Sequence, residues 1–204
     1  MTRGARLVLA SRSAVRIKLL EDAGIALDID PADVDEDAIG APVSDPAARA
    51  LALATAKGRA VSARHPGRLV LGGDQVGVLV KDDGSCGAFL EKPRDPAHHV
   101  RLLLQMAGRT HRFHPAAVLV VDGDVRERVA DTVAVTFRAF DERTARAYVA
   151  TGEGQGSCGG YESEHRGAQL IERIDGAAHA VLGLPLLGVL AALRRVAPAG
   201  MLLV

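Results

Sequence analysis

A polar segment lies near the start of the chain, where an apolar run passes into a helical pattern. Leu7–Ala10 is apolar, and Ser11, Ser13 and Arg16 follow it directly. Ser13 is a residue type that caps helices, and the first N–H groups of a helix carry a partial positive charge. Hydroxyls and a guanidinium beside such a helix end suit an anion, above all phosphate. Simple capping by Ser13 with surface cations is the other interpretation, and this segment alone leaves both open.

A single carboxylate interrupts the most apolar stretch of the sequence. Asp74 stands in "RLVLGGDQVGVLV", directly after Gly72 and Gly73. A carboxylate removed from water is costly unless it is paired or binds a metal. Glycines beside it would let a ligand or another backbone come close. The segment predicts either a functional carboxylate or a turn residue at the end of a strand.

Further charged residues could join such a site. The run "DVDED" offers Asp35, Glu36 and Asp37, and clustered carboxylates suit Mg²⁺ or Mn²⁺. A solvated acidic loop is the commoner interpretation of a run of this kind. Lys57 lies in an Ala-rich helical pattern and Lys92 in "LEKP". These lysines matter for chemistry only if they converge on the same anion.

The remaining polar clusters are less specific. A Gly-rich segment, "TGEGQGSCGG", precedes Glu162 and Glu164, and a carboxylate held there could bind the edge of a nucleobase. Equally, these residues could be exposed charges beside a strand. His98-His99 and the segment His111–His114 match no strong metal-binding signature. Their spacing favours structural or surface roles.

Composition excludes several classes of protein. The chain has 204 residues, 48% of them hydrophobic, which suits one α/β domain or two small lobes that share a core. Because 25 basic residues balance 25 acidic ones, a general binder of nucleic acid polymers is not expected. Cys86 and Cys158 form no C-x-x-C pair, which predicts a reduced, cytoplasmic setting. The apolar run at Leu7–Ala10 is too short for a signal segment or a membrane span.

Strand and helix patterns alternate in the first half, and hairpin signals dominate the middle. This order predicts a mixed central sheet with helices on its sides. Asp122-Gly123 is a hairpin signal between two of the strands. The expected strands cover 7–10, 68–80 (interrupted by "GGDQ"), 113–121, 133–140 and 168–174. The expected helices cover 13 to about 23, a long stretch from Asp45-Pro46, Asp95 to about 108, 141–150 and 185–195.

The order of these segments resembles that of the Maf family, and the resemblance covers nearly the whole chain. The matching segments are "LVLASRSAVRIKLLEDAGI", "DVDED", "ALALATAKGRA", "LVLGGDQVGVL", "LEKPRD", "VAVTFRAF" and "GLPL". The resemblance implies an inosine-triphosphatase-like α/β fold, with a mixed central sheet flanked by helices. It implies a single Maf-like domain over 1–204, with two lobes around one nucleotide cleft. Family members, historically called septum formation inhibitors, hydrolyse a nucleoside triphosphate to a monophosphate and pyrophosphate with a divalent metal.

The resemblance also assigns roles to individual residues. Asp74 matches the proton acceptor, and Glu36 with Asp74 matches the metal-binding positions for Mg²⁺, Mn²⁺ or Co²⁺. The positions expected to bind the triphosphate are Ser11, Ser13, Arg16, Lys57 and Lys92. The implied partner is a nucleoside triphosphate, without a nucleic acid polymer or a membrane, and a homodimer is left open.

Two positions bear on the substrate. The combination of Gln75 and Glu164 resembles the branch of the family that acts on 7-methyl-GTP, whereas many members have Thr and Gln there. A Glu carboxylate can accept hydrogen bonds from the N1–H and N2–H groups of guanine, and it would favour the cationic methylated ring. A dTTP/UTP or broad-specificity pyrophosphatase is the alternative within this class. A non-catalytic, nucleotide-binding regulator of division is the alternative outside it.

The first motif departs from the family pattern. The usual S-x-S-P-R-R is "SRSAVRI" here, so Ala14 replaces Pro and Ile17 replaces the second Arg. Val15 occupies a specificity position that is often aromatic or Arg, so stacking on the base is lost there. The departures predict weaker triphosphate binding or a shifted substrate preference.

Overall fold

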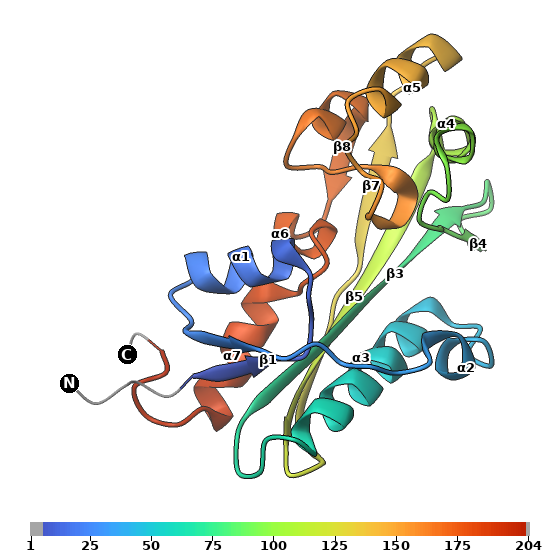
Figure 1. The fold of residues 1–204 in the computed structure, drawn as a ribbon. Helices are drawn as coiled ribbons and strands as arrows, with labels where there is room; N and C mark the ends of the chain where they lie inside the picture. Colours follow the sequence, from blue (N-terminus) through green and yellow to red (C-terminus); the bar gives the residue numbers. More distant parts are fainter. Residues whose placement is uncertain (1–5, 203–204) are drawn as a thin grey trace. The chain divides into compact units, whose positions relative to one another are not determined.

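The computed structural model describes residues 6–202, which divide into two compact units (Figure 1). The first unit contains the chain up to Gln75, Pro115–Asp131 and the chain from Gly183. The second unit contains Val76–His114 and Thr132–Leu182. Strands β3 (Val70–Val80) and β5 (Thr110–Val121) each run from one unit into the other.

The first unit is a small α/β layer. Its strands follow the order β2-β1-β3-β5, with β6 beside β5. Strand β1 is parallel to both β2 and β3, and β5 and β6 form an antiparallel hairpin. The elements that belong to this unit alone are β1 (Leu7–Leu9), α1 (Ala14–Asp22), β2 (Leu27–Ile29), α2 (Glu36–Gly40), α3 (Pro46–Ser62), β6 (Asp124–Ala130) and α7 (Leu186–Val196).

An aliphatic core holds this unit together. Leu9 of β1, Leu71 of β3 and Leu119 of β5 are buried in the same apolar cluster as Leu193 of α7. Burying each of these side chains is worth about 1.5–3 kcal/mol. Ile17, the residue in place of the second motif arginine, packs against the same core from α1. The start of α1 is therefore anchored to the sheet by apolar packing.

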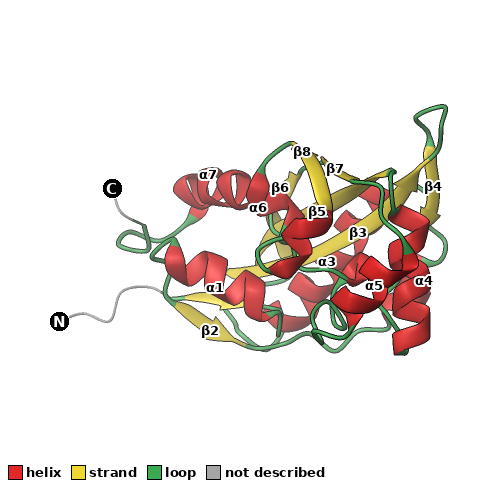
Figure 2. Ribbon diagram, turned by 90° about the horizontal axis from the view of Figure 1, so that it is seen from above, coloured by secondary structure: helices red, strands yellow, loops and turns green. Residues whose placement is uncertain are grey.

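The second unit is a mixed layer of antiparallel strands and helices. Its strands follow the order β3-β5-β7-β8, with β4 beside β3, and β7 is antiparallel to both of its neighbours. Helices α4 and α5 lie side by side (Figure 2). The elements that belong to this unit alone are β4 (Cys86–Phe89), α4 (Pro96–Met106), β7 (Val133–Phe137), α5 (Glu142–Val149), β8 (Ile171–Asp175), α6 (Ala178–Val181) and the 3-10 turns Cys158–Gly160 and Arg166–Leu170.

The expected mixed α/β fold is confirmed, and the interruption expected at "GGDQ" is wrong. Strand β3 continues through Gly72, Gly73 and Asp74 without a break. The glycine at 72 serves close packing, because an added Cβ would lie 2.3 Å from the carbonyl oxygen of Ala54 and 2.6 Å from the nitrogen of Gly58. Helix α3 thus lies directly against the strand that carries Asp74.

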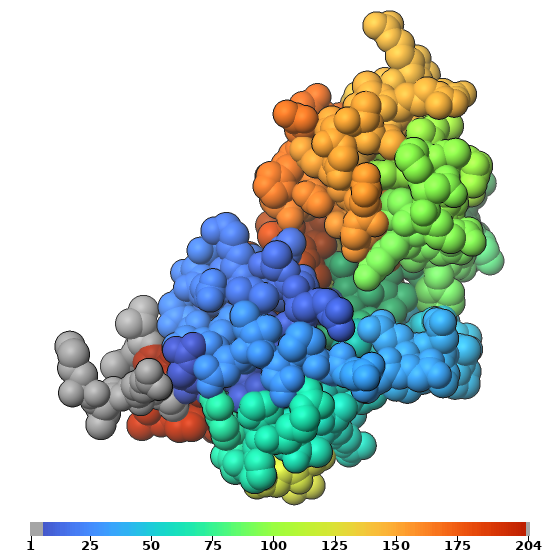
Figure 3. Space-filling model, viewed as in Figure 1, coloured from blue at the N-terminus to red at the C-terminus, as the bar shows by residue number. Residues whose placement is uncertain are grey.

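The acidic run is not a plain loop. Asp35 caps helix α2 by accepting a hydrogen bond from the N–H of Ala38 at 2.9 Å, so Glu36 is the first helical residue. The interpretation of this run as an acidic loop is therefore wrong for Glu36 and Asp37, which begin a helix. The side chains at the start of α2 are exposed, and this helix lies at the surface (Figure 3).

The hairpin turn is confirmed, but its expected partner strand is wrong. Asp122 and Gly123 have φ values of +52° and +82°, as a tight hairpin turn requires. The turn leads into β6, which the sequence analysis did not predict, because its charged residues alternate with only a few apolar ones. Strand β7 pairs with the other half of β5. Part of the strand expected over 168–174 is a 3-10 turn, Arg166–Leu170.

Candidate functional site

Asp74 is held by an ion pair with Lys57. Asp74 is 7% exposed on β3, and the Nζ of Lys57 on α3 lies 2.6 Å from its Oδ1. The same Nζ lies 2.8 Å from Oε1 of Glu36, at the start of α2. Three residues that the sequence analysis singled out, from three separate segments, therefore meet at one ammonium group.

The three partners differ in their exposure to solvent. The side chain of Lys57 is 12% exposed, whereas that of Glu36 is 57% exposed. The pair of Lys57 and Asp74 therefore lies in a shielded environment, and Glu36 approaches it from the solvent side. Because an ammonium and two carboxylates stand together, the site can bind anions through Lys57 and accept protons or cations through the carboxylates.

Arg16 connects the start of α1 to the strand that carries Asp74. Its Nε donates to the carbonyl of Gly183 at 2.9 Å, and its Nη1 donates to the carbonyl of Gly73 at 3.0 Å. Burial lowers the pKa of Arg16, and the nearby carboxylates of Asp74 and Glu36 oppose this effect. The third guanidinium nitrogen, Nη2, takes no part in the hydrogen bonds to Gly183 and Gly73. The guanidinium thus fixes the peptide directly before Asp74, a role that the sequence analysis did not predict.

The two serines make local hydrogen bonds. Ser13 caps α1, because its Oγ accepts from the N–H of Arg16 at 3.4 Å. Ser11 is buried, and its Oγ accepts from the N–H of Ser13 at 3.2 Å and from Nη1 of Arg16 at 3.4 Å. Capping by Ser13 is confirmed, whereas Arg16 is not a surface cation, because its guanidinium is bound to two backbone carbonyls. The binding of phosphate by the same segment stays a prediction.

The other predicted positions are distributed over both units. Val15 is half-buried on α1, and Gln75 follows Asp74 on β3. Lys92 and Glu164 belong to the second unit, and both are exposed. Ser163 donates a hydrogen bond from its Oγ to Oε2 of Glu164 at 3.4 Å. That Lys92 and Glu164 act on the same ligand as Asp74 stays a prediction.

Glu36 and Asp74 fit a metal site whose ligands come partly from the protein and partly from a bound phosphate. Within residues 6–202, no group of three or more His, Cys, Asp or Glu side chains could hold a metal ion. Glu36 and Asp74 offer two carboxylates that converge on the Nζ of Lys57. Mg²⁺ is commonly bound by one or two carboxylates together with substrate phosphates and water. This donor set therefore fits a cation of that class only when a phosphate supplies further ligands.

The family model described as "Maf-like protein" matches residues 6–196 of this chain. The chain belongs to the Maf-like family. It is 40% identical over 195 residues to a "7-methyl-GTP pyrophosphatase" of Mesorhizobium japonicum, and the alignment covers 93% of this chain and 95% of the relative. It is 39% identical to a "Nucleoside triphosphate pyrophosphatase 1" of Jannaschia sp., covering 93% and 96%. A "7-methyl-GTP pyrophosphatase" of Rhizobium etli is 38% identical, covering 93% and 95%.

A solved structure with a distant likeness to this Maf-like chain is a HAM1 protein from Coxiella burnetii. It aligns with a TM-score of 0.44 and 16% identity, over 64% of this chain and 70% of the other. So remote a likeness says nothing about activity. Within residues 6–202, no helix is long and apolar enough to cross a bilayer.

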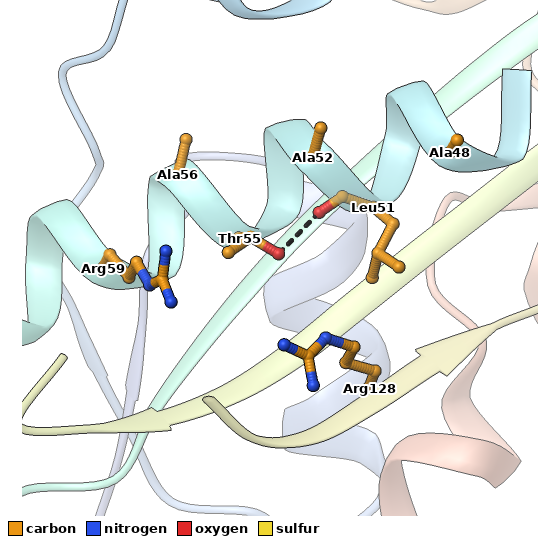
Figure 4. Close-up of a pocket in the computed structure, with 7 residues that line it drawn as sticks. All are labelled: Ala48, Leu51, Ala52, Thr55, Ala56, Arg59 and Arg128. Carbon is orange, nitrogen blue, oxygen red and sulfur yellow. Dashed lines mark hydrogen bonds between the residues drawn. The ribbon is translucent and has the colours of Figure 1, made fainter. Parts of the chain in front are cut away.

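A shallow groove of about 470 Å³ lies on another face of α3 in this Maf-like chain (Figure 4). It contains none of the predicted site residues. Thr55 uses its hydroxyl to donate to the carbonyl of Leu51 at 2.7 Å, so that polar group is already engaged. The residues that line the groove are Ala48, Leu51, Ala52, Thr55, Ala56, Arg59 and Arg128. The groove is thus separate from the cluster around Lys57.

Proposed function

We propose that this protein hydrolyses a nucleoside triphosphate to a nucleoside monophosphate and diphosphate, and that 7-methyl-GTP is its preferred substrate. The observation that carries the proposal is the meeting of Asp74, Lys57 and Glu36 at one ammonium group, joined through Arg16 to the start of α1. Membership of the Maf-like family and the names of the relatives support it.

Different residues of the proposed site accept the proton and bind the phosphates. Water attacks a phosphoryl phosphorus, and Asp74 accepts the proton that the water loses. A new P–O bond forms as the phosphoanhydride bond between the α- and β-phosphates breaks, which yields the monophosphate and diphosphate. Lys57 and the guanidinium of Arg16 offer positive charge to the phosphate oxygens, and so do the first N–H groups of α1. Ser11, Ser13 and Lys92 complete the proposed triphosphate site.

Glu36 and Asp74 would hold the divalent cation, which we propose to be Mg²⁺, Mn²⁺ or Co²⁺. Bound there, such a cation would neutralise charge on the phosphates. Lys57 now stands between the two carboxylates at 2.8 and 2.6 Å, so it would share them with the cation. The exposed Glu36 side chain is the carboxylate that is free to turn toward either partner.

The base is proposed to be read by Gln75 and Glu164. The carboxylate of Glu164 can accept from the N1–H and N2–H groups of guanine, whereas uracil and thymine would turn ring carbonyls toward it. Unmatched polar groups of this kind cost about 1–3 kcal/mol, which corresponds to roughly tenfold to a hundredfold discrimination. The broader name carried by the Jannaschia relative favours a second candidate, a pyrophosphatase of wider specificity.

A substrate panel tests the proposal. Release of diphosphate is measured with 7-methyl-GTP, GTP, dTTP and UTP, each with Mg²⁺, Mn²⁺ or Co²⁺. We expect 7-methyl-GTP to give the highest kcat/KM. A preference for dTTP or UTP would reject the substrate and keep the reaction, whereas binding without turnover would reject the reaction and favour a regulatory protein. In the double variant Glu164→Gln, Gln75→Thr, we expect lower 7-methyl-GTP turnover and a gain of dTTP or UTP hydrolysis.

The cellular location is proposed to be the cytoplasm. Neither Cys86 nor Cys158 forms a disulfide within residues 6–202. Free thiols are typical of reducing compartments, where disulfides are rare. Fractionation of the producing cells, with immunodetection of the protein in each fraction, tests this location.

A further inference from the structure

Three buried side chains of the second unit converge on one short segment of backbone. They are His99 of α4, His111 of β5 and Tyr148 of α5, and their exposed fractions are 1%, 0% and 5%. Their polar atoms contact the segment Gly160–Glu162, which follows the Gly-rich loop. Buried polar groups are costly unless they are hydrogen-bonded, so a convergence of three on one segment fixes its position.

Each anchor makes a different hydrogen bond. Nε2 of His99 lies 2.5 Å from the carbonyl oxygen of Gly160, and since a carbonyl only accepts, Nε2 carries the hydrogen. The hydroxyl of Tyr148 accepts from the N–H of Glu162 at 3.1 Å. Nε2 of His111 lies 2.8 Å from the hydroxyl of Tyr161. Three consecutive residues of the segment are therefore held, two by their backbone and one by its side chain.

The segment Gly160–Glu162 is also closely packed against the side chains that anchor it. Gly160 has a φ of +74°, and an added Cβ would lie 2.8 Å from Cδ2 and 2.9 Å from Nε2 of His99. The ring of His111 lies edge-on to the ring of Tyr161, with their centroids 5.5 Å apart. Such a close fit leaves the backbone at Gly160 with little freedom to shift.

The segment leads directly to Glu164. The side chain of Glu162 is itself held, because its Oε1 accepts from the N–H of Gly154 at 3.2 Å and its Oε2 lies 3.2 Å from Nδ1 of His165, the residue after Glu164. Glu164 itself is exposed. An exposed side chain does not position itself, so its location depends on the anchored backbone just before it.

The two residues directly before this segment hold the chain that precedes Lys92. The N–H of Gly159 donates to the carbonyl of Glu91 at 2.9 Å, and Sγ of Cys158 donates to the carbonyl of Leu90 at 3.3 Å. Two positions that the proposed function assigns to the ligand, Lys92 and Glu164, therefore share one anchored support.

We propose that His99, His111 and Tyr148 are positioning residues for base selectivity, acting through Gly160–Glu162 to hold Glu164 where it can pair with the base. The inference rests on the proposed function, since it assigns a role to the base-reading residue named there. It adds three residues that would touch neither the base nor the phosphates. A side chain that only supports the fold would not change the ratio of affinities for two bases.

The test compares Tyr148→Phe and Tyr161→Phe with a matched control, Thr110→Val. Each Phe variant keeps its ring and loses one anchoring hydroxyl. The control removes the hydrogen bond between the hydroxyls of Thr110 and Thr136, which is 2.9 Å long and lies between β5 and β7 of the same unit. Calorimetry measures the dissociation constants of 7-methyl-GMP and UMP, so the readout does not depend on hydrolysis. Circular dichroism shows whether each variant is folded.

We expect wild type and Thr110→Val to prefer 7-methyl-GMP by a similar ratio. In both Phe variants that ratio should fall roughly tenfold, because 7-methyl-GMP binds more weakly while UMP is little affected. In hydrolysis the same variants should raise KM for 7-methyl-GTP more than they lower kcat.

An unchanged ratio in the folded Phe variants, or an equal fall in the control, would overturn the inference. So would a wild type that binds both monophosphates equally. Failure of the proposed reaction is a separate outcome, namely a wild type that selects between the monophosphates and releases no diphosphate from any triphosphate.

Discussion

The substitution Arg16→Lys keeps the positive charge of residue 16 and removes the planar fork of the guanidinium. Arg16 reaches two backbone carbonyls at once, those of Gly73 at 3.0 Å and Gly183 at 2.9 Å. A lysine ammonium is a single point donor and does not reproduce this geometry. At least one of the two bonds is lost, and a hydrogen bond to a charged group is worth about 1.5–3 kcal/mol. We therefore expect the free energy of unfolding to fall by about that amount.

The activity of Arg16→Lys should change in a characteristic way. Because the peptide of Gly73 directly precedes Asp74, loosening it misplaces the proton acceptor. A shift of about 1 Å at a reacting group can lower the rate by as much as a hundredfold, so we expect kcat to fall at least tenfold. Loss of a phosphate contact alone would instead raise KM at constant kcat.

The assay combines urea unfolding with steady-state release of diphosphate from 7-methyl-GTP. The matched control is Arg12→Lys, the same substitution at an exposed position four residues earlier. It should change the free energy of unfolding by no more than about 0.5 kcal/mol. The reasoning is refuted if Arg16→Lys is as stable as the control and raises only KM, because Arg16 would then act on the ligand and not on the backbone.

Three further predictions concern the fold, its pH dependence and the cation. Burial lowers the pKa of His111 to about 3, so between about pH 6.5 and 3 the unfolded chain binds a proton that the folded chain does not. The free energy of unfolding should be highest above about pH 6.5 and fall by up to about 1.4 kcal/mol per pH unit below that pH. Urea unfolding of His111→Gln should lack this part of the pH dependence. An identical pH slope in the variant and the wild type would contradict the prediction. Gly72→Ala should lower the free energy of unfolding by about 3 kcal/mol through collision with α3, whereas Gly156→Ala, with no atom within 4 Å of its added Cβ, should be nearly neutral. Diphosphate release should stop in EDTA and return with excess Mg²⁺, Mn²⁺ or Co²⁺; full activity in the chelator would remove the cation from the mechanism.

Local sequence signals predicted much of the fold. Ser13, Asp45 and Asp95 were expected to begin helices, and each caps one in the structure. The turn at Asp122-Gly123 was equally clear, since few residues adopt positive φ without strain. Such signals act within a few residues of the chain, which is why they can be read without knowledge of tertiary contacts.

Signals that depend on tertiary contacts were missed. Strand β6 has a run of charged residues, Arg126–Arg128, and only its pairing with β5 makes it a strand. Gly72 suggested an interruption, because nothing in the sequence shows that α3 would lie against it. In both cases the contacting residues lie farther apart along the chain than the few residues over which local sequence patterns act.

The candidate site shows the same division. Asp74 stood out because a lone carboxylate in an apolar strand is unusual, and Lys57 and Glu36 could be joined to it only through the family resemblance. The hydrogen bonds from Arg16 to two backbone carbonyls could not be predicted, since every residue has a carbonyl and the sequence does not show which ones lie near Arg16. The clusters that contain His99 and His111 were expected to have structural or surface roles, and nothing in the sequence marked Tyr148, because tyrosines are common in cores. The relation of Lys92 and Glu164 to Asp74 stays a prediction.

The most direct test of the central claim is the hydrolysis of 7-methyl-GTP by Asp74→Asn, measured beside the binding of 7-methyl-GMP. Asn has the same shape and keeps an oxygen that can accept from Lys57, so the fold and the binding of the monophosphate should persist. Removing a general base typically lowers the rate on the order of 10²–10⁴-fold. We therefore predict that the folded variant binds 7-methyl-GMP and releases diphosphate at no more than about a hundredth of the wild-type rate. Retention of more than about a third of the wild-type rate would contradict the assignment of Asp74 as the proton acceptor.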